Sequence, residues 1–180
     1  MTRSTKKTFL RSQSGTVAIE FAFIAPILIL LFLGTIELCN ALICREKATT
    51  VASTAADLVT QDTTITLAQL NDVFAATNTV MYPYPASGTK IIITSVKADP
   101  NHTNQYIVDW SKATSNTTAH TPNASITIPL GIVTANGSVV MAEVSYTYTP
   151  PSNAVIHAPI TMSSTFYSRP RKSAFVVYTP

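Results

Sequence analysis

The hydrophobic residues of this chain are concentrated in one block near the N-terminus. Residues 17–36 read VAIEFAFIAPILILLFLGTI, and Glu20 is the only charged residue among them. A helix of this length rises about 30 Å, which matches the hydrocarbon core of a bilayer. The block therefore predicts a membrane-spanning helix. A kink is expected at Pro26, because proline removes one backbone hydrogen bond of the helix.

Small apolar residues recur at helical spacing over residues 45–62, a segment that contains neither glycine nor proline. We expect the membrane helix to continue through this segment as a stalk and to end near Asp62. A second, short amphipathic helix is predicted over Thr66–Phe74, with Thr66 as its N-cap. The same residues also fit a loop with a single helical turn.

The pattern changes to that of strands after Pro83, Pro85 and Gly88, which interrupt any helix. The run Val139–Thr149 alternates clearly between the two faces of a strand. Residues 115–129 are polar and rich in threonine, and we expect an exposed loop there. The predicted strands are Ile91–Ala98, Gln105–Ala113, Val139–Thr149 and Ile160–Tyr167.

Together these patterns predict an α+β protein, in which a long N-terminal transmembrane and stalk helix precedes a small antiparallel β-sheet domain. The first expected part is a basic cytoplasmic leader over residues 1–15, which is cleaved off. A transmembrane helix over 16–44 and a helical stalk over 45–62 follow it. The last part is a β-rich extracytoplasmic domain over 63–180.

The distribution of charge predicts the orientation in the membrane. Four basic residues give the leader a charge of +4 with no acidic residue, and the rest of the chain carries a net charge of −1. Because basic flanks stay in the cytoplasm, we expect a single-pass protein with a cytoplasmic N-terminus and a periplasmic or extracellular C-terminal domain. The chain beyond the leader is not basic, so no nucleic-acid-binding surface is expected. The four residues are Arg3, Lys6, Lys7 and Arg11.

The residues after the apolar block distinguish three kinds of N-terminal signal. A secretory signal ends in a small-residue cleavage site, and a lipoprotein signal places small residues before its cysteine. Glu37 and Leu38 precede Cys39, which fits neither kind. A signal that is cut before the apolar block fits best. Cys39 and Cys44, the only cysteines, lie about 140° apart around a helix and are expected to remain unbridged apolar residues.

The stretch Ser14–Phe21, SGTVAIEF, resembles the processing site of type IV pilin-like precursors. In that family a membrane peptidase cuts after a glycine that follows a short basic leader. The fifth residue of the mature chain is then a glutamate, often followed by an aromatic residue. By this resemblance the cut falls between Gly15 and Thr16, Glu20 is the fifth mature residue, and Phe21 follows it.

The chemistry of this stretch suits such a role. Gly15 disfavours helix, so we expect the helix to begin after it and to leave the scissile bond accessible. Glu20 lies one helical turn beyond Thr16, and a carboxylate at membrane depth is costly unless it is paired. The amine of a mature Thr16, in the same chain or in a neighbouring subunit, is the expected partner. The alternative is that Glu20 reaches back to the cytoplasmic interface.

A longer pattern joins this site to later positions, namely Gly15, Glu20, Phe21, Pro26, Glu37, Tyr146–Pro150 and Arg169–Arg171. On this pattern the chain is similar to TadE-like proteins, which are minor pseudopilins of the tight-adherence (Flp) pilus system. The pattern does not separate TadE from its sister TadF. We do not expect the longer sister TadG, because its additional large domain has no counterpart here.

No pattern of catalytic or metal-binding residues emerges from the sequence. His102, His120 and His157 are widely spaced and have no cysteine partner, so no metal site is predicted. The chain contains no nucleophile-elbow motif and no glycine-rich phosphate loop. We therefore predict no enzyme activity, no cofactor and no small-molecule substrate.

The aromatic residues of the strand-rich part admit two interpretations. Asp109, which stands beside Trp110, fits a strand residue better than the carboxylate of a catalytic dyad. Trp110, Tyr146 and Tyr148 fit core and cross-strand packing, and a surface for sugar or protein is the alternative.

We therefore predict a structural protein of the bacterial inner membrane, a minor pseudopilin that a prepilin peptidase processes. It would contact other pilin or pseudopilin subunits through its first helix and would serve the assembly of a pilus used in adhesion. The rival hypothesis is a signal-anchored extracytoplasmic enzyme or ligand-binding domain unrelated to pili. The mature N-terminus separates the two hypotheses, because the first requires Thr16 there and the second requires an intact leader.

Overall fold

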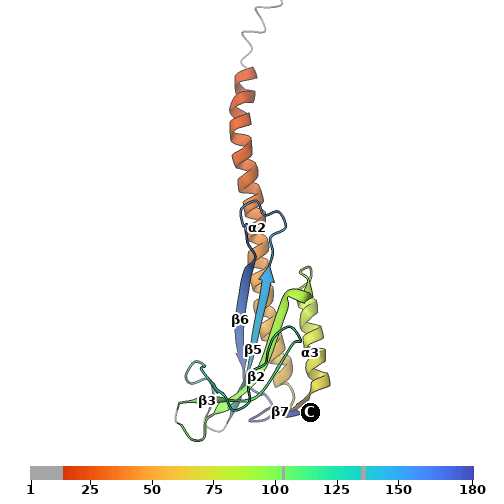
Figure 1. Cartoon of the computed structure of the whole chain (residues 1–180), viewed down its shortest axis with the longest axis vertical. Coiled ribbons are helices and arrows are strands. Elements are labelled where there is room, and N and C mark those ends of the chain that lie inside the picture. The colour runs from red at the N-terminus through yellow and green to blue at the C-terminus, as the bar shows by residue number, and fades with distance from the viewer. Residues whose placement is uncertain (1–13, 103, 135–136) are drawn as a thin grey trace, which may run out of the picture. The chain divides into compact units, whose positions relative to one another are not determined.

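The computed structural model describes residues 14–102, 104–134 and 137–180. The four basic residues of the leader lie outside the described residues. Within them a long helix comes first, a short helix follows, and a five-stranded antiparallel sheet completes the fold (Figure 1). The expected α+β class, a long N-terminal helix followed by an antiparallel sheet, is confirmed.

Helix α2 runs from Ser14 to Thr60 without interruption. It ends close to the expected Asp62, and helix ends commonly vary by one or two residues. The expectation that the helix begins after Gly15 is wrong, because Gly15 lies inside its first turn. A helix tolerates one glycine at a cost of about 1 kcal/mol, which its neighbours offset here. Pro26 lies within the helix, and the kink there remains a prediction.

Helix α3, Leu67–Val80, follows a capping box. The Thr66 side-chain oxygen accepts a hydrogen bond from the Gln69 amide at 3.3 Å, and the Gln69 side chain accepts one from the Thr66 amide at 2.8 Å. Both bonds satisfy amides that a helix start leaves unpaired. The predicted helix with Thr66 as its cap is therefore confirmed. The alternative of a loop with one helical turn is wrong, because the helix continues past Phe74.

All four predicted strands are present, and their ends differ from the expected ones by at most two residues. They form the sheet β4-β3-β2-β5-β6, in which every neighbouring pair is antiparallel. The central pair β2 and β5 is in register from Thr89↔Tyr146 to Lys97↔Ser138. The four strands are β2 (Thr89–Ala98), β3 (Tyr106–Ala113), β5 (Ser138–Tyr148) and β6 (Ile160–Ser168).

Three short strands are not predicted by the sequence pattern. Strand β4, Ser125–Ile126, pairs with β3, so residues 115–129 are not wholly a loop. Strand β1, Thr64–Thr66, pairs in parallel with β7, Val177–Thr179. A strand of two or three residues is too short to show an alternating pattern, and each of these pairings joins segments that are distant in sequence.

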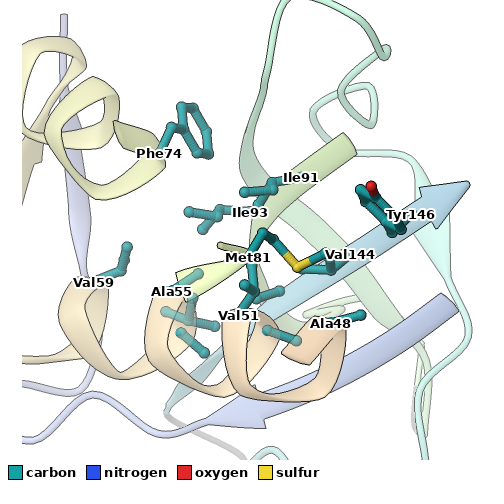
Figure 2. Close-up of a cluster of buried hydrophobic side chains, with 14 of the residues drawn as sticks. Ala48, Val51, Ala55, Val59, Phe74, Met81, Ile91, Ile93, Val144 and Tyr146 are labelled. Atoms are coloured by element: carbon teal, nitrogen blue, oxygen red, sulfur yellow. The ribbon is translucent and has the colours of Figure 1, made fainter. Parts of the chain in front are cut away.

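The core lies between the sheet and the second part of α2. In Figure 2 the side chains of α2 point toward those of the strand residues Ile91, Ile93 and Val144. The α2 residues are Ala48, Val51, Ala55 and Val59. The predicted alternation of β5 is confirmed, since its even-numbered residues from Val140 to Tyr148 all belong to this core. These residues are Val140, Ala142, Val144, Tyr146 and Tyr148.

The chain divides into two compact units. One comprises the chain up to Asn40 together with the loop Pro150–Ala158, which connects β5 to β6. The other comprises Ala41–Thr149 and Pro159–Pro180. The first unit thus contains the predicted processing site, and the second contains the sheet and its core.

Candidate functional site

The first part of α2 is apolar on all sides. Among the described residues, α2 is the one helix that is long and apolar enough to cross a membrane, by length and composition. None of its most apolar stretch is buried, because the large side chains point outward around the whole circumference. A helix that is apolar all round requires an apolar environment on every side. A lipid bilayer provides one, which makes this segment a candidate membrane anchor.

The predicted site residues all lie on this part of α2, and the structure brings no other segment of the described chain to them. Gly15, Thr16, Glu20, Phe21 and Pro26 are exposed. Within the described chain Glu20 forms no ion pair. A Cβ atom added at Gly15 would meet nothing within 4 Å. These side chains are therefore free to contact molecules other than their own chain, and their roles remain predictions.

Further along the helix, Gly34 allows the loop between β5 and β6 to lie directly on α2. A Cβ atom at this position would be 2.9 Å from Cγ2 of Val155, closer than side chains approach in proteins. A larger residue here would displace Val155. The loop Pro150–Ala158, which we call the β5–β6 loop, is thus packed against the helix one turn before Glu37.

Glu37 is fully buried and is held by this loop. Its Oε1 accepts hydrogen bonds from the Ser152 hydroxyl and from the Ala154 amide, the latter at 2.8 Å. Its Oε2 accepts hydrogen bonds from the amides of Val155 at 3.1 Å and Ile156 at 2.8 Å. All four partners donate, so they match an ionised carboxylate, which only accepts. A protonated carboxyl would turn a donor toward other donors.

The conformation of the loop explains how three consecutive amides reach one carboxylate. Asn153, just before them, has a φ of 50°, in the left-handed region that asparagine tolerates better than most residues. Such a turn aligns successive N–H groups on one concave side, which favours an anion. The loop is therefore a preformed anion-binding turn, and the anion it holds is a side chain of the same protein.

Sequence reasoning placed Glu37 in the family pattern but gave it no role. One signal was present, because Glu37 is the only charged residue between Glu20 and Arg45. A charge in such a segment needs a partner. The partners lie 115 to 119 residues later in the chain, in a stretch with no acidic or basic residue, so no local pattern could identify them.

Trp110, Tyr146 and Tyr148 belong to the core. Trp110 and Tyr148 are only 7% and 2% exposed, which makes the alternative of a sugar or protein surface wrong for these side chains. The Trp110 indole donates a hydrogen bond to the Val176 carbonyl at 2.7 Å. Tyr84 packs edge-on against Tyr146 and Tyr148, with ring centroids 6.1 Å apart in both pairs. Burial raises the pKa of Tyr146.

The late arginines hold the C-terminal segment in place. The Arg171 guanidinium pairs with the Asp57 carboxylate near the end of α2, and the Arg171 amide donates to the Thr60 carbonyl at 3.0 Å. The Arg169 guanidinium donates to the Ile132 carbonyl at 2.9 Å. These contacts give the residues that contributed to the family resemblance a structural role within the fold.

Three pairs of titratable groups form in and around the sheet. Asp109 forms an ion pair with Lys97 of the adjacent strand at 2.5 Å, as expected of a strand residue. His102 contacts Asp99 at 2.7 Å, and His120 contacts Glu143 at 2.6 Å. In the part of the chain that the structure describes, no three histidine, cysteine or acidic side chains gather as metal ligands do.

One hollow of about 480 Å³ lies beside α3 and the start of β2. Its lining contains small and amide side chains, such as those of Asn71, Asn78 and Asn116, and the Phe74 ring. None of the lining residues is charged, so they offer neither a general base nor a metal ligand of the usual kinds. Nothing in this hollow indicates a reaction.

The comparisons with known proteins address the helical segment. The family model described as TadE-like protein matches residues 15–57. The match covers nearly all of α2, including Gly15, Glu20 and Glu37. The resemblance predicted from the sequence is thereby confirmed, and it relates the chain to a pilus-associated family. No curated protein and no solved structure matches the chain.

Proposed function

With a TadE-like segment over residues 15–57 as the premise, we propose that this protein is a minor pseudopilin of a tight-adherence (Flp) pilus. A prepilin peptidase removes the leader, and the mature protein remains in the bacterial inner membrane through α2. It joins other pilin or pseudopilin subunits there and serves the assembly of an adhesive pilus. The single observation that carries the proposal is the match of this segment, which includes both Gly15 and Glu20.

The surroundings of Gly15 support processing at this position. The fold itself does not require glycine there, since a Cβ atom would point into open space and the backbone is helical. Gly34 provides the contrast, because there a Cβ atom would clash with the Val155 side chain. A glycine that the fold does not need is consistent with recognition by another protein. The peptidase is the proposed protein.

The exposed apolar surface of α2 supports assembly within the membrane. Phe21 is 64% exposed, and the apolar residues around it are similarly uncovered. In a bilayer, helices associate by close packing and by pairing polar groups that lipid cannot satisfy. Glu20 is such a group. We propose that it pairs with the mature amine of Thr16, in its own chain or in a neighbouring subunit.

The test is the mature N-terminus. Mass spectrometry of the natively expressed protein should find Thr16 as the first residue, with the fifteen residues before it removed. Gly15→Leu should leave the leader attached, because a bulky side chain would occupy the glycine position of the peptidase. The matched control is Val17→Leu, an exposed substitution two residues away that should be processed normally.

An intact leader on the wild-type protein would contradict the proposal. That outcome would favour the rival hypothesis, a signal-anchored extracytoplasmic enzyme or ligand-binding domain. Removal of the leader from Gly15→Leu as readily as from Val17→Leu would show that Gly15 is not the recognised residue.

A further inference from the structure

The β5–β6 loop touches α2 within the segment that is expected to lie in lipid. Counting from Val17, the 30 Å of a hydrocarbon core end near Ile36. Val155 contacts Gly34, which precedes that point, and the loop's amides bind Glu37, which directly follows it. The loop therefore meets the helix at the distal boundary of the membrane.

The contact between Glu37 and the loop satisfies polar groups of both partners that would otherwise be unpaired in an apolar environment. A loop has backbone N–H groups without partners, and leaving them unsatisfied in an apolar environment is costly. A carboxylate at this depth is also costly when it is bare. Here the carboxylate accepts three of the loop's amides and one hydroxyl. Once they are bound, neither the loop nor the helix presents these polar groups to its surroundings.

The chemistry of the loop also suits an apolar environment. Residues 144–168, which contain the whole loop, include no aspartate, glutamate, lysine or arginine. Val155 remains 48% exposed after packing against Gly34. On α2 the exposed apolar side chains continue beyond Glu37, through Leu38 to Ile43. The apolar surface of the helix is thus longer than the hydrocarbon core, and the loop contacts this helix at Gly34.

We propose that the β5–β6 loop enters the distal interface of the bilayer and is a second membrane-contacting segment of this protein. Val155 faces the lipid, and Glu37 anchors the loop by binding its amides. The occupant of this surface is the bilayer itself, since the surface is continuous with that of the membrane anchor. This inference goes beyond the proposed pilus function, and it depends only on α2 being inserted in a membrane.

A nitroxide spin label tests the proposal in the full-length protein, reconstituted in vesicles of phosphatidylethanolamine and phosphatidylglycerol. The background variant is Cys39→Ser, because Cys39 is exposed and Cys44 is buried and should not react. The label is attached at Val155→Cys, and its collision rates with oxygen, which concentrates in lipid, and with a water-soluble nickel chelate are measured. Leu28→Cys on the anchor and Leu130→Cys in the unit of the sheet are the lipid and water references, both being exposed.

The label at Val155 should give a ratio of oxygen to nickel collisions well above that at Leu130 and below that at Leu28, because Leu28 lies near the middle of the hydrocarbon core and the loop lies at its distal interface. A ratio equal to that at Leu130 would overturn the proposal, because it would place the loop in water. A water-like ratio at Leu28 would also overturn it, by showing that α2 is not in the bilayer. Low collision rates with both reagents at Val155 would mean that protein covers the loop, and would overturn it as well.

A second variant tests the anchoring role of Glu37. In Glu37→Gln the amide group of the new side chain faces donors, so at least two of the four hydrogen bonds are lost. The Val155 label should then become more mobile and collide more often with the nickel chelate than in the parent protein. Glu46→Gln, an exposed substitution on the same helix, is the matched control and should change neither measurement. An unchanged label in Glu37→Gln would overturn the anchoring role.

Discussion

At the scale of single residues, the two glycines of α2 show how the same residue type answers different demands. Gly34 lies under the Val155 side chain, and a Cβ atom there would be 2.9 Å from Cγ2 of Val155, so a larger residue would displace that side chain. Gly15 is not required by any contact in the described chain. The two glutamates differ in the same way, since Glu37 has four donors from its own chain and Glu20 forms no ion pair in the described chain. Within the described chain, the contacts thus account for Gly34 and Glu37 but not for Gly15 and Glu20.

The first prediction at this scale separates cleavage from assembly at Glu20. Glu20→Gln keeps the length of the side chain but removes its charge, and it lies five residues beyond the proposed scissile bond. We expect normal removal of the leader and normal membrane insertion. Copurification with other pilin subunits should fall, and cells should carry few pili, because the mature amine of Thr16 loses its partner.

Glu46→Gln is the control for this experiment, since Glu46 is an exposed glutamate on the same helix. It should leave both processing and piliation unchanged. Normal piliation with Glu20→Gln would mean that Glu20 only reaches to the interface. Loss of cleavage would mean that the peptidase recognises Glu20.

At the scale of elements, helix α2 uses two kinds of apolar residue for two environments. Its first part carries large side chains, such as those of Phe21 and Leu31, and these are exposed. Its second part carries Ala48, Ala52 and Ala55, and these are buried against the sheet. Small side chains let a helix approach a sheet closely, whereas large apolar side chains suit contact with lipid. The same helix is therefore a candidate membrane anchor over one length and a core element over the other.

The capping box of α3 gives a prediction about a single element. Thr66→Ala removes the side-chain acceptor of the Gln69 amide, so the free energy of unfolding should fall by about 1 kcal/mol. Urea denaturation of the full chain in detergent micelles, followed by the fluorescence of the buried Trp110, would measure it. Thr63→Ala, an exposed substitution just before β1, should change the unfolding free energy far less. Equal losses in both variants would show that the cap does not stabilise α3.

At the scale of the whole molecule, charge and the apolar helix together set the expected topology. The leader carries +4, while the distal flank of the anchor offsets Arg45 and Lys47 with Glu46. The basic side of a span stays in the cytoplasm. The sheet and its core would accordingly lie outside the cytoplasm, on the opposite side of the membrane from the four basic residues.

A reporter enzyme fused after Pro180 tests this topology without interrupting β7. A reporter that folds only outside the cytoplasm should be active, and one that works only inside the cytoplasm should be silent. Replacing the four basic residues of the leader by asparagine should reduce the activity of the first reporter, because the charge difference across the anchor is lost. Activity of the cytoplasmic reporter on the unaltered protein would reverse the orientation.

The sequence by itself determined the features that depend on local chemistry. The length of the apolar block predicted one long helix, and the alternation of β5 predicted which face of that strand enters the core, because both follow from the geometry of a single element. The cap at Thr66 was also predictable, since a capping box lies within four residues. The part of the TadE-like resemblance that the family model confirms lies on one helix, within residues 15–57.

Only the tertiary structure decided the features that join distant segments. Three such features connect residues more than 100 positions apart. They are the binding of Glu37 by the β5–β6 loop, the close contact of Val155 with Gly34 and the pairing of β1 with β7. The hydrophobic periodicity of a sequence does not reveal such contacts, because the distant partner of a residue does not determine which residues stand next to it in the sequence. A lone carboxylate beside an apolar segment shows that a partner is needed, and the folded chain shows that three amides and a hydroxyl of one loop supply it.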